Sequence, residues 1–442
     1  MNQRILAFLR ADRFLLHIVL LAVILRLVVI YLLYTPYPPT EFNPIMTEIG
    51  WIGFSIATGQ GFSSPFIDPS GPSAWAAPLY PYLVALVFKW MGPQSLGATL
   101  VLYYLSSAFS AFTLVPIYSI AQRCFREGVA RGACWLWTFL PMLILLPLHI
   151  VWETALSTML LAFLFLMTLN LRDSDRARDW LVYGLLWGVA GLTNPALLLG
   201  VPFLTAWACW HLCAQGRRWL RSGALAAAVV VACITPWMVR NYVVFDKIIL
   251  MRSNLGLELY LGNHPDHPSS WAFWLHPSDD VEERQKFREM GEAAYMDEKM
   301  DLALDYIRAN PGRFVVLSAN RFIYFWTSTD DTLQDLWHAA VKDIRALYHA
   351  LRDTSYALVG VFGLCGLWLA VRRGVPEATP MALLMISYPA LYYFTHITKR
   401  FRNPLDPLLV ILTVYFFAWL WGKIRKQNSE IRNNLADQNS KF

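Results

Sequence analysis

A single carboxylate, Glu48, stands beside the apolar stripe of a short helix that the pattern "TEIGWIGFSIATGQGF" (Thr47–Phe62) predicts. On a wheel of about 100° per residue, Glu48 falls about 60° from the first member of the stripe, which comprises Ile45, Ile49, Ile52 and Ile56. Such a helix can lie at a membrane interface and hold the carboxylate against a cavity, where it can exchange protons. A solvated charge is the alternative, and Glu41 and Asp68 are competing carboxylates nearby.

Five basic residues are candidates for binding an anion: Arg240, Arg252, Lys399, Arg400 and Arg402. The topology argued below places all five on the outer side of a membrane, against the usual distribution of Lys and Arg. An anionic ligand would explain that position, since guanidinium groups bind phosphate and carboxylate well. Snorkelling of the side chains to lipid phosphates is the alternative.

Polar side chains that suit a hydroxyl-rich ligand lie in the sequence close to Arg240 and Arg252. They are Asn241, Asn254, Glu258 and Asn263. The same region contains His264, His267 and His276, but they lie in a Pro-rich stretch without tight metal-ligand spacing, so we predict no metal site there. Arg26 lies in the middle of an apolar run and predicts a buried pair, for which Glu153 is a candidate; Glu153 is otherwise expected to cap a helix.

The elements that must position these residues are membrane spans. Of 442 residues, 56% are hydrophobic and 15% charged, which is typical of a polytopic membrane protein. The first apolar run is too long for a cleavable signal peptide. Ten spans of about 20 residues are predicted: Phe14–Tyr34, Leu96–Gln122, Ala130–Ile150, Glu153–Leu171, Trp180–Asn194, Ala196–Ala214, Ser222–Val239, Ser355–Val371, Thr379–His396 and Leu405–Trp421.

The sidedness follows from the short basic loops. Pro78–Met91 is apolar but too short to span easily, so we expect a re-entrant or interfacial element. With it left outside, every short basic loop falls on one side, which the positive-inside rule assigns to the cytoplasm together with both termini. These loops carry Arg4, Arg10 and Arg13; Arg123, Arg126 and Arg131; Arg172, Arg176 and Arg178; Arg217, Arg218 and Arg221; Arg372 and Arg373; and Lys423, Arg425 and Lys426.

Two large segments then lie outside, Thr35–Ser95 and Asn241–Ala350. The second has a net charge of −6, so the overall charge of +6 reflects basic cytoplasmic rims and says nothing about nucleic acid. Within it, Glu282–Asn310 predicts a solvated helical cover and Phe314–Trp326 an interfacial helix. The expected organisation is a membrane module 1–240 with the outer loop 35–95, an outer region 241–350, C-terminal helices 351–422 and a disordered tail 423–442.

Several phrases in order resemble one family. "EIGWIGFSIATGQGFSSPF" and "GPSAWAAPLYPYLVALVFKWMG" are similar to the first periplasmic loop of bacterial GT-C glycosyltransferases, the polyprenyl-phosphate-sugar-dependent enzymes related to protein O-mannosyltransferases and to the aminoarabinose transferase of lipid A. "GLTNPALL", "TPWMVRNYVVF", "SNLGLELYLGN" and "HITKRFRNPLDP" continue the resemblance over most of the chain. It implies an all-α GT-C-like fold of about ten spans in a bacterial inner membrane, with the active site facing the periplasm.

The resemblance also implies an activity: inverting transfer of a hexosyl or pentosyl group from a polyprenyl-phosphate donor to a protein hydroxyl, lipid A or another glycolipid. Glu48 matches the family's carboxylate at the acceptor. The five cations would hold the donor phosphate, and Tyr80, Asn241, Asn254, Glu258 and Asn263 would contact substrate. The loop lacks an acidic pair, so no cofactor is predicted and a divalent metal is not indicated.

Two other functions fit a polytopic chain. A transporter or flippase for a lipid-linked sugar is the main alternative, although such proteins more often show internal repeats and polar residues at mid-bilayer, whereas here the candidates gather at one face. A structural subunit of an envelope assembly is the third, and it would not need the outer cations.

Overall fold

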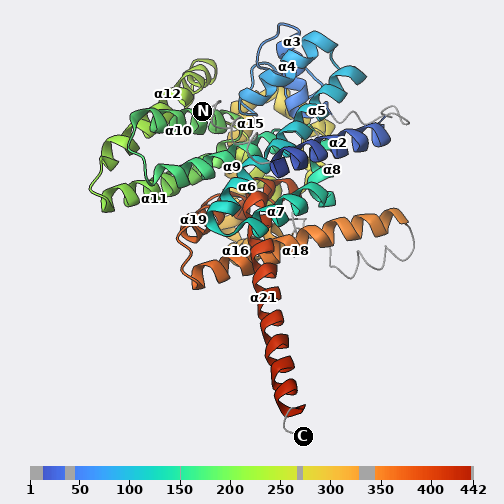
Figure 1. Cartoon of the computed structure of the whole chain (residues 1–442). Helices are drawn as coiled ribbons and strands as arrows, with labels where there is room; N and C mark the ends of the chain where they lie inside the picture. Colours follow the sequence, from blue (N-terminus) through green and yellow to red (C-terminus); the bar gives the residue numbers. More distant parts are fainter. Residues whose placement is uncertain (1–12, 35–44, 150, 266–271, 328–343, 440–442) are drawn as a thin grey trace.

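A computed structural model describes residues 13–34, 45–149, 151–265, 272–327 and 344–439 (Figure 1). Within these ranges the regular elements are helices, and β-structure is limited to one antiparallel bridge between Ser63 and Pro72. The chain is therefore an all-α protein, as the apolar periodicity predicts.

Seven helical stretches are long and apolar enough to cross a membrane in the described part of the chain. They are Arg13–Leu32, Leu96–Cys124, Thr154–Leu171, Pro195–Ala214, Trp219–Phe245, Ala350–Arg372 and Lys399–Ile431. An eighth forms if α7 (Glu127–Phe139) and α8 (Pro141–His149), which meet at a bend of 49°, are counted as one span. The protein is thus a multi-pass membrane protein.

The predicted number of ten is not confirmed, because two predicted spans are short or broken. Trp180–Asn194 corresponds to α10 (Ala177–Thr193), a helix of only 17 residues. Thr379–His396 is divided into α19 (Ala378–Ser387) and α20 (Ala390–Phe394). Pro389 lies at that division, where its missing N–H interrupts the helical ladder.

Small residues allow the long helices to pack closely. The bundle includes α2 (Arg13–Tyr34), α5 (Leu96–Phe112), α6 (Leu114–Cys124), α9 (Thr154–Leu171), η1 (Pro195–Gly200), α11 (Val201–Ala214), α12 (Trp219–Phe245), α18 (Ile344–Arg372) and α21 (Asp406–Asn439). A Cβ on Gly366 would lie 2.1 Å from the Leu412 carbonyl oxygen, and one on Gly184 would lie 2.7 Å from that of Ala226. Glycine is needed at both contacts, α18 with α21 and α10 with α12.

The first outer segment folds as two short helices joined by a tight turn region. In α3 (Glu48–Ala57), Ile45, Ile49 and Ile52 are buried as the predicted stripe requires. Gly59, Gly61 and Gly71 have φ of +84°, +75° and +83°, a left-handed conformation that glycine adopts without steric cost. The predicted short apolar element is α4 (Leu79–Met91), which packs against α3.

The second outer segment is more buried than we expect from its charge. Its helices are α13 (Leu255–Asn263), η2 (Phe273–Leu275), α14 (Val281–Met290), α15 (Glu292–Ala309) and α16 (Pro311–Thr327). The predicted solvated cover is wrong for α15, because Glu292 and Lys299 are only 3% and 1% exposed. Glu292 Oε1 accepts hydrogen bonds from Ala74 N (2.6 Å) and Ser253 Oγ (2.7 Å), which joins the two outer segments.

The C-terminal tail is helical up to Asn439, in contrast to the predicted disorder. Helix α21 continues beyond the span and projects from the rest of the molecule (Figure 1). The tail lacks an apolar face, but Lys, Arg, Glu and Gln are good helix formers. Lys426 and Glu430 add an exposed i,i+4 pair at 3.9 Å. Helix propensity therefore prevails over the lack of packing in this stretch.

Candidate active site

Glu48 faces a histidine from the second outer segment. His276 Nε2 lies 3.6 Å from Glu48 Oε1, and Ser278 Oγ donates to the same oxygen at 3.2 Å. The backbone N–H of Ser278 donates to His276 Nδ1 at 3.1 Å, so in the neutral imidazole the proton is on Nε2, toward Glu48. Glu48 lies at the first turn of α3, where the helix dipole favours a carboxylate. This carboxylate is therefore held and oriented by a partner from another segment.

Aromatic rings fix that partner in place. His276 meets Trp75 edge-on with ring centroids 5.5 Å apart, and Phe66 contacts both rings, at 4.9 Å from Trp75 and 6.0 Å from His276. Phe287 of α14 closes the cluster at 5.2 Å from Phe66. The rigid first outer segment thus supplies the wall against which the imidazole is packed.

A second carboxylate, Glu258 of α13, lies in the same electrostatic neighbourhood. Its Oε1 accepts from Asn254 Nδ2 at 2.7 Å and its Oε2 lies 3.2 Å from His396 Nδ1. Burial raises the pKa of the Glu258 carboxyl, and the field of Glu48 adds to this. Burial likewise lowers the pKa of His396 well below its ordinary range. Burial therefore disfavours the charged form of both members of this pair, while the fields of His276, Arg252 and Arg400 act in the opposite direction on Glu258.

Two guanidinium groups lie within electrostatic range of these carboxylates. Arg400 lies in η3 (Lys399–Phe401) and stacks over the Trp152 ring at 3.9 Å. Among the described residues its guanidinium has no hydrogen-bond or ion-pair partner, although the fields of Glu153, Glu48 and Glu258 reach it. Arg252 Nε donates to the Trp75 carbonyl at 2.9 Å, and its field reaches Glu258 and Arg400. Both cations retain donors for a further anion.

Glu153, directly before the membrane helix α9, is the third carboxylate of this cluster. It is the N-cap residue of α9, as predicted, although its side chain makes no capping hydrogen bond. Its Oε2 is buried without a partner in the described part of the chain. Its field reaches Arg400 and the buried Tyr80, Tyr388 and Tyr392. Glu153 Oε2 is therefore available to accept a hydrogen bond from a ligand or a water molecule.

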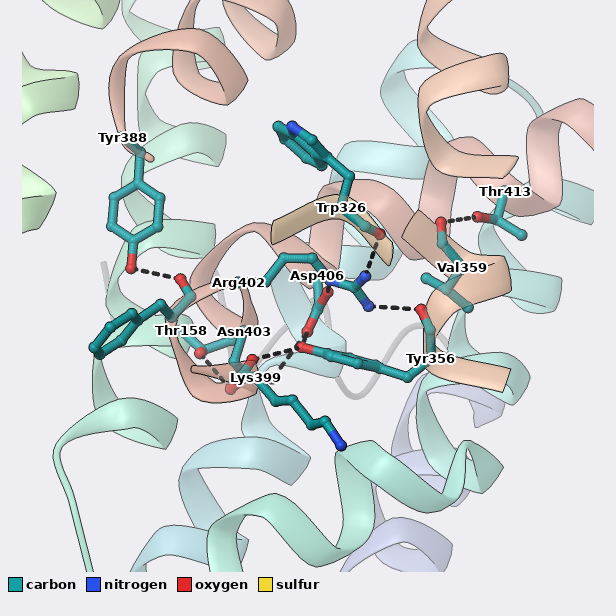
Figure 2. Close-up of polar contacts among 11 residues, drawn as sticks. Thr158, Trp326, Tyr356, Val359, Tyr388, Lys399, Arg402, Asn403, Asp406 and Thr413 are labelled. Atoms are coloured by element: carbon teal, nitrogen blue, oxygen red, sulfur yellow. Dashed lines mark hydrogen bonds and ion pairs between the residues drawn. The ribbon is translucent and has the colours of Figure 1, made fainter. Parts of the chain in front are cut away.

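Arg402, although only two residues from Arg400, belongs to the scaffold (Figure 2). It is 1% exposed, and Nε donates to Asp406 Oδ1 at 2.9 Å. Its NH1 and NH2 donate to the carbonyls of Trp326 (2.8 Å) and Tyr356 (2.7 Å), so α16, α18 and η4 (Asn403–Leu405) are joined. Asn403 extends the network to Thr158 of α9 at 2.7 Å.

Other candidates are also committed to the protein. Lys399 Nζ lies 2.6 Å from Asp353 Oδ2. Arg240 NH1 and NH2 donate to the carbonyls of Ser73 (2.6 Å) and Phe62 (2.9 Å), which anchors the first outer segment to α12. Asn241 Nδ2 donates to the Ile249 carbonyl at 3.1 Å. Arg240 and Asn241 thus hold the outer segments in place, whereas Lys399 ties η3 to α18.

Asn263 and Tyr80 have internal partners as well. Asn263 Nδ2 donates to the carbonyls of Leu259 (2.8 Å) and Phe394 (3.1 Å). Tyr80 Oη lies 3.4 Å from Ser106 Oγ, and burial raises the pKa of this phenol. Asn254, as described, orients Glu258 directly.

The remaining sequence hypotheses meet different outcomes. Arg26 is fully buried but donates to the Ala22 carbonyl (3.2 Å) and Ser110 Oγ (3.1 Å), so no pair with Glu153 is formed. Asp68 Oδ2 accepts from Arg284 Nε at 3.0 Å. Glu41 and His267 lie outside the described residues. No group of three or more metal-binding side chains occurs within the described ranges.

Sequence reasoning missed the histidines and a buried arginine. His276 was considered only for metal, and His396 was not singled out. Arg321 of α16 is fully buried and donates to the Phe394 carbonyl at 3.1 Å and to that of Gly262, which holds α13 against the chain near His396. A Cβ on Gly262 would lie 1.8 Å from the Thr395 carbonyl oxygen, so this close approach needs glycine.

The arrangement defines a helical membrane protein with a polar cluster, called the outer cluster below, built from four separate segments. Residues 75–239 match the dolichyl-phosphate-mannose-protein mannosyltransferase family. No curated protein sequence matches the chain.

Solved structures extend the similarity to the whole fold. The Archaeoglobus fulgidus oligosaccharyltransferase AglB, in complex with an inhibitory peptide and a dolichol-phosphate, is 14% identical with a TM-score of 0.54, over 96% of this chain and 52% of that chain. The same organism's enzyme tethered to an acceptor peptide gives 13% and 0.55, over 94% and 50%. ArnT from Cupriavidus metallidurans, bound to undecaprenyl phosphate, gives 14% and 0.42, over 90% and 77%.

The chain spans about half the length of these oligosaccharyltransferases. It has the GT-C fold, and the resemblance to GT-C membrane glycosyltransferases that the sequence indicates is confirmed.

Proposed function

We propose that the chain is an inverting membrane glycosyltransferase that moves a sugar from a polyprenyl-phosphate donor to an acceptor hydroxyl on a protein, lipid A or another glycolipid. The observation that carries this proposal is that Glu48, paired with His276, and the cations Arg252 and Arg400 lie within electrostatic range in one cluster. The family match and the GT-C fold support it.

The roles follow from the chemistry of transfer. Glu48 takes the proton of the acceptor hydroxyl while an oxygen lone pair attacks the anomeric carbon. The bond from that carbon to the phosphate oxygen breaks, and its electron pair leaves with the polyprenyl phosphate. Arg252 and Arg400 bind the phosphate and stabilise the charge that develops on it. His276 orients Glu48, and Asn254 orients Glu258 in the cluster.

The donor phosphate fits the two cations better than the other three candidates. Arg402 and Lys399 each have a carboxylate partner, and Arg240 donates to two backbone carbonyls. Arg400 has only aromatic partners among the described residues, Trp152 and Phe401. A planar guanidinium fixed by stacking is preorganised for bidentate binding of a phosphate.

The proposed orientation places this cluster at the periplasmic face of a bacterial inner membrane, with both termini in the cytoplasm. The basic short loops support it through the positive-inside rule. A lipid donor would then present its head group at the outer interface, beside α3 and α4, which are apolar but too short to span. The transfer step as proposed uses no metal.

The test is release of polyprenyl phosphate from a labelled polyprenyl-phosphate sugar in proteoliposomes. Glu48→Gln keeps the shape of the side chain but cannot accept the proton, so turnover should be lost while donor binding is kept. Asp68→Asn is the matched control, since Asp68 pairs with Arg284, and it should stay active. Full activity of Glu48→Gln would remove Glu48 from the catalytic role, and absence of turnover by the wild type with every donor and acceptor would favour the transporter.

A further inference from the structure

A cavity of about 860 Å³ lies at the end of the bundle where three short basic loops meet. It is formed by the α6–α7 junction, the segment after α18 and the part of α21 that leaves the span. Its lining comprises Cys124, Phe125, Arg126, Val129, Arg373, Val375, Tyr415, Ala418, Trp419, Gly422, Lys423 and Lys426. None of these residues belongs to the outer cluster.

The charge of this cavity is wholly positive. Four of the lining residues are Arg or Lys and none is acidic. Arg126, Arg373 and Lys423 have no hydrogen-bonded or ionic side-chain partner in the part of the chain that the structure describes, and Lys426 lies 3.9 Å from Glu430. Outside the cavity, Arg131 by contrast lies 2.6 Å from Glu127. The cavity therefore concentrates cations that the protein does not neutralise.

Aromatic rings form the wall between these cations. Trp419 lies under both Arg373 and Lys423, at 5.8 Å and 5.7 Å from the ring centroid. Tyr415 stacks on Phe125 with centroids 4.1 Å apart. Amphipathic rings beside Lys and Arg are typical of the depth at which lipid head groups lie.

The position along α21 agrees with a membrane surface. Lys423 lies 17 residues beyond Asp406, which is part of the scaffold under the outer cluster. At 1.5 Å per residue this is about 26 Å, close to the thickness of a bilayer's hydrocarbon core. The cavity and the outer cluster thus face opposite leaflets.

We propose that this cavity binds the head group of an anionic phospholipid from the leaflet opposite the candidate active site. Arg126, Arg373 and Lys423 contact the phosphate, and Trp419 packs on the glycerol region. Val129, Val375 and Ala418 offer apolar surface to the first acyl carbons, which a free phosphate would not need. The inference does not depend on the proposed transferase activity.

Native mass spectrometry of the detergent-solubilised full chain tests the proposal, with phosphatidylglycerol and phosphatidylcholine titrated separately. The test variant is Arg126→Gln/Arg373→Gln. The matched control is Arg176→Gln/Arg178→Gln, which removes the same charge from exposed positions of a basic loop outside the cavity. Circular dichroism and gel filtration establish that both variants fold.

We expect wild type and control to retain phosphatidylglycerol in preference to phosphatidylcholine. The test variant should bind phosphatidylglycerol roughly 30-fold more weakly, since each surface cation contributes about fivefold. An equal loss of phosphatidylglycerol binding in the control would mean that the lipid responds to the overall positive charge and not to this cavity, which would overturn the proposal. Equal retention of the two lipids, or displacement of phosphatidylglycerol by millimolar inorganic phosphate, would also overturn it, the latter in favour of a free-phosphate site.

Discussion

Glu48 Oε1 and His276 Nε2 lie 3.6 Å apart, although one residue belongs to the first outer segment and the other to the second. This contact is held in place because Trp75 and Phe66 pack around the imidazole and the Ser278 backbone N–H fixes its tautomer. The two outer segments must therefore dock correctly before the proposed catalytic carboxylate is oriented. Glu292 and Arg252 provide further ties at the same junction.

Replacing His276 should slow the proposed transfer without weakening the binding of the donor. In His276→Ala, Glu48 loses its orienting partner, and misplacement of a reacting group by about 1 Å can cost about 100-fold in rate. We expect kcat for release of polyprenyl phosphate to fall about 10- to 100-fold with KM for the donor unchanged. His276→Gln, which keeps a donor near the Nε2 position, should recover part of kcat. A rise in KM alone would show that His276 contacts the donor instead.

Arg400 and Lys399 are adjacent cations, but we expect only the substitution of Arg400 to lower the affinity for the donor. Arg400→Gln removes a charge with no ionic partner in the described residues, so donor affinity should fall by about 2 kcal/mol, or about 30-fold. Lys399→Gln is the matched control, because Arg352 still lies 2.8 Å from Asp353 after the lysine is removed. Donor titrations followed by fluorescence in the same detergent compare the two. An equal loss of donor affinity in Lys399→Gln would show that Lys399 also binds the donor phosphate.

The sequence indicates Glu48, Arg252 and Arg400 because their types and positions are local properties. The isoleucine stripe predicts the helix α3 that carries Glu48. Arg252 and Arg400 are indicated because Lys and Arg are uncommon on the predicted outer side of a membrane protein. The glycine turns of the first outer segment were also predictable, since Gly59, Gly61 and Gly71 adopt positive φ.

Other features depend on contacts that spacing does not encode. Arg400 and Arg402 are alike in sequence, but the 3-10 turn directs one toward the outer cluster and buries the other. The available signal was Asp406, four residues after Arg402, which is the spacing of a helical ion pair. His276 and His396 carried no such signal, because their partners lie on distant segments.

Arg402 should matter for stability and not for donor affinity. Arg402→Gln leaves Asp406 buried without its cation and removes two bonds to backbone carbonyls. Breaking such a buried pair costs about 3–5 kcal/mol, so the thermal midpoint in detergent should fall by several degrees. The double variant Arg402→Gln/Asp406→Asn should recover part of the loss, since no unpaired carboxylate remains. Unchanged stability with lost donor affinity would restore Arg402 to the anion site.

Glu292 should make stability depend on pH in a direction that can be derived. Burial raises the pKa of its carboxyl, while the bonds from Ser253 and Ala74 N–H and the field of Arg240 oppose this only in part. As pH rises through the ordinary value of 4.5, the unfolded chain releases this proton and the folded chain retains it. The free energy of unfolding then falls, by at most about 1.4 kcal/mol per pH unit, until the folded carboxyl also ionises.

Glu292→Gln keeps an acceptor for both hydrogen bonds and cannot ionise, so its thermal midpoint should rise relative to wild type as pH increases from 4.5 to 7. Glu289→Gln, at an exposed position on the neighbouring helix α14, should show no such trend. A wild-type midpoint that stays parallel to that of Glu292→Gln over this range would mean that the Glu292 carboxyl ionises at its ordinary pKa despite its burial.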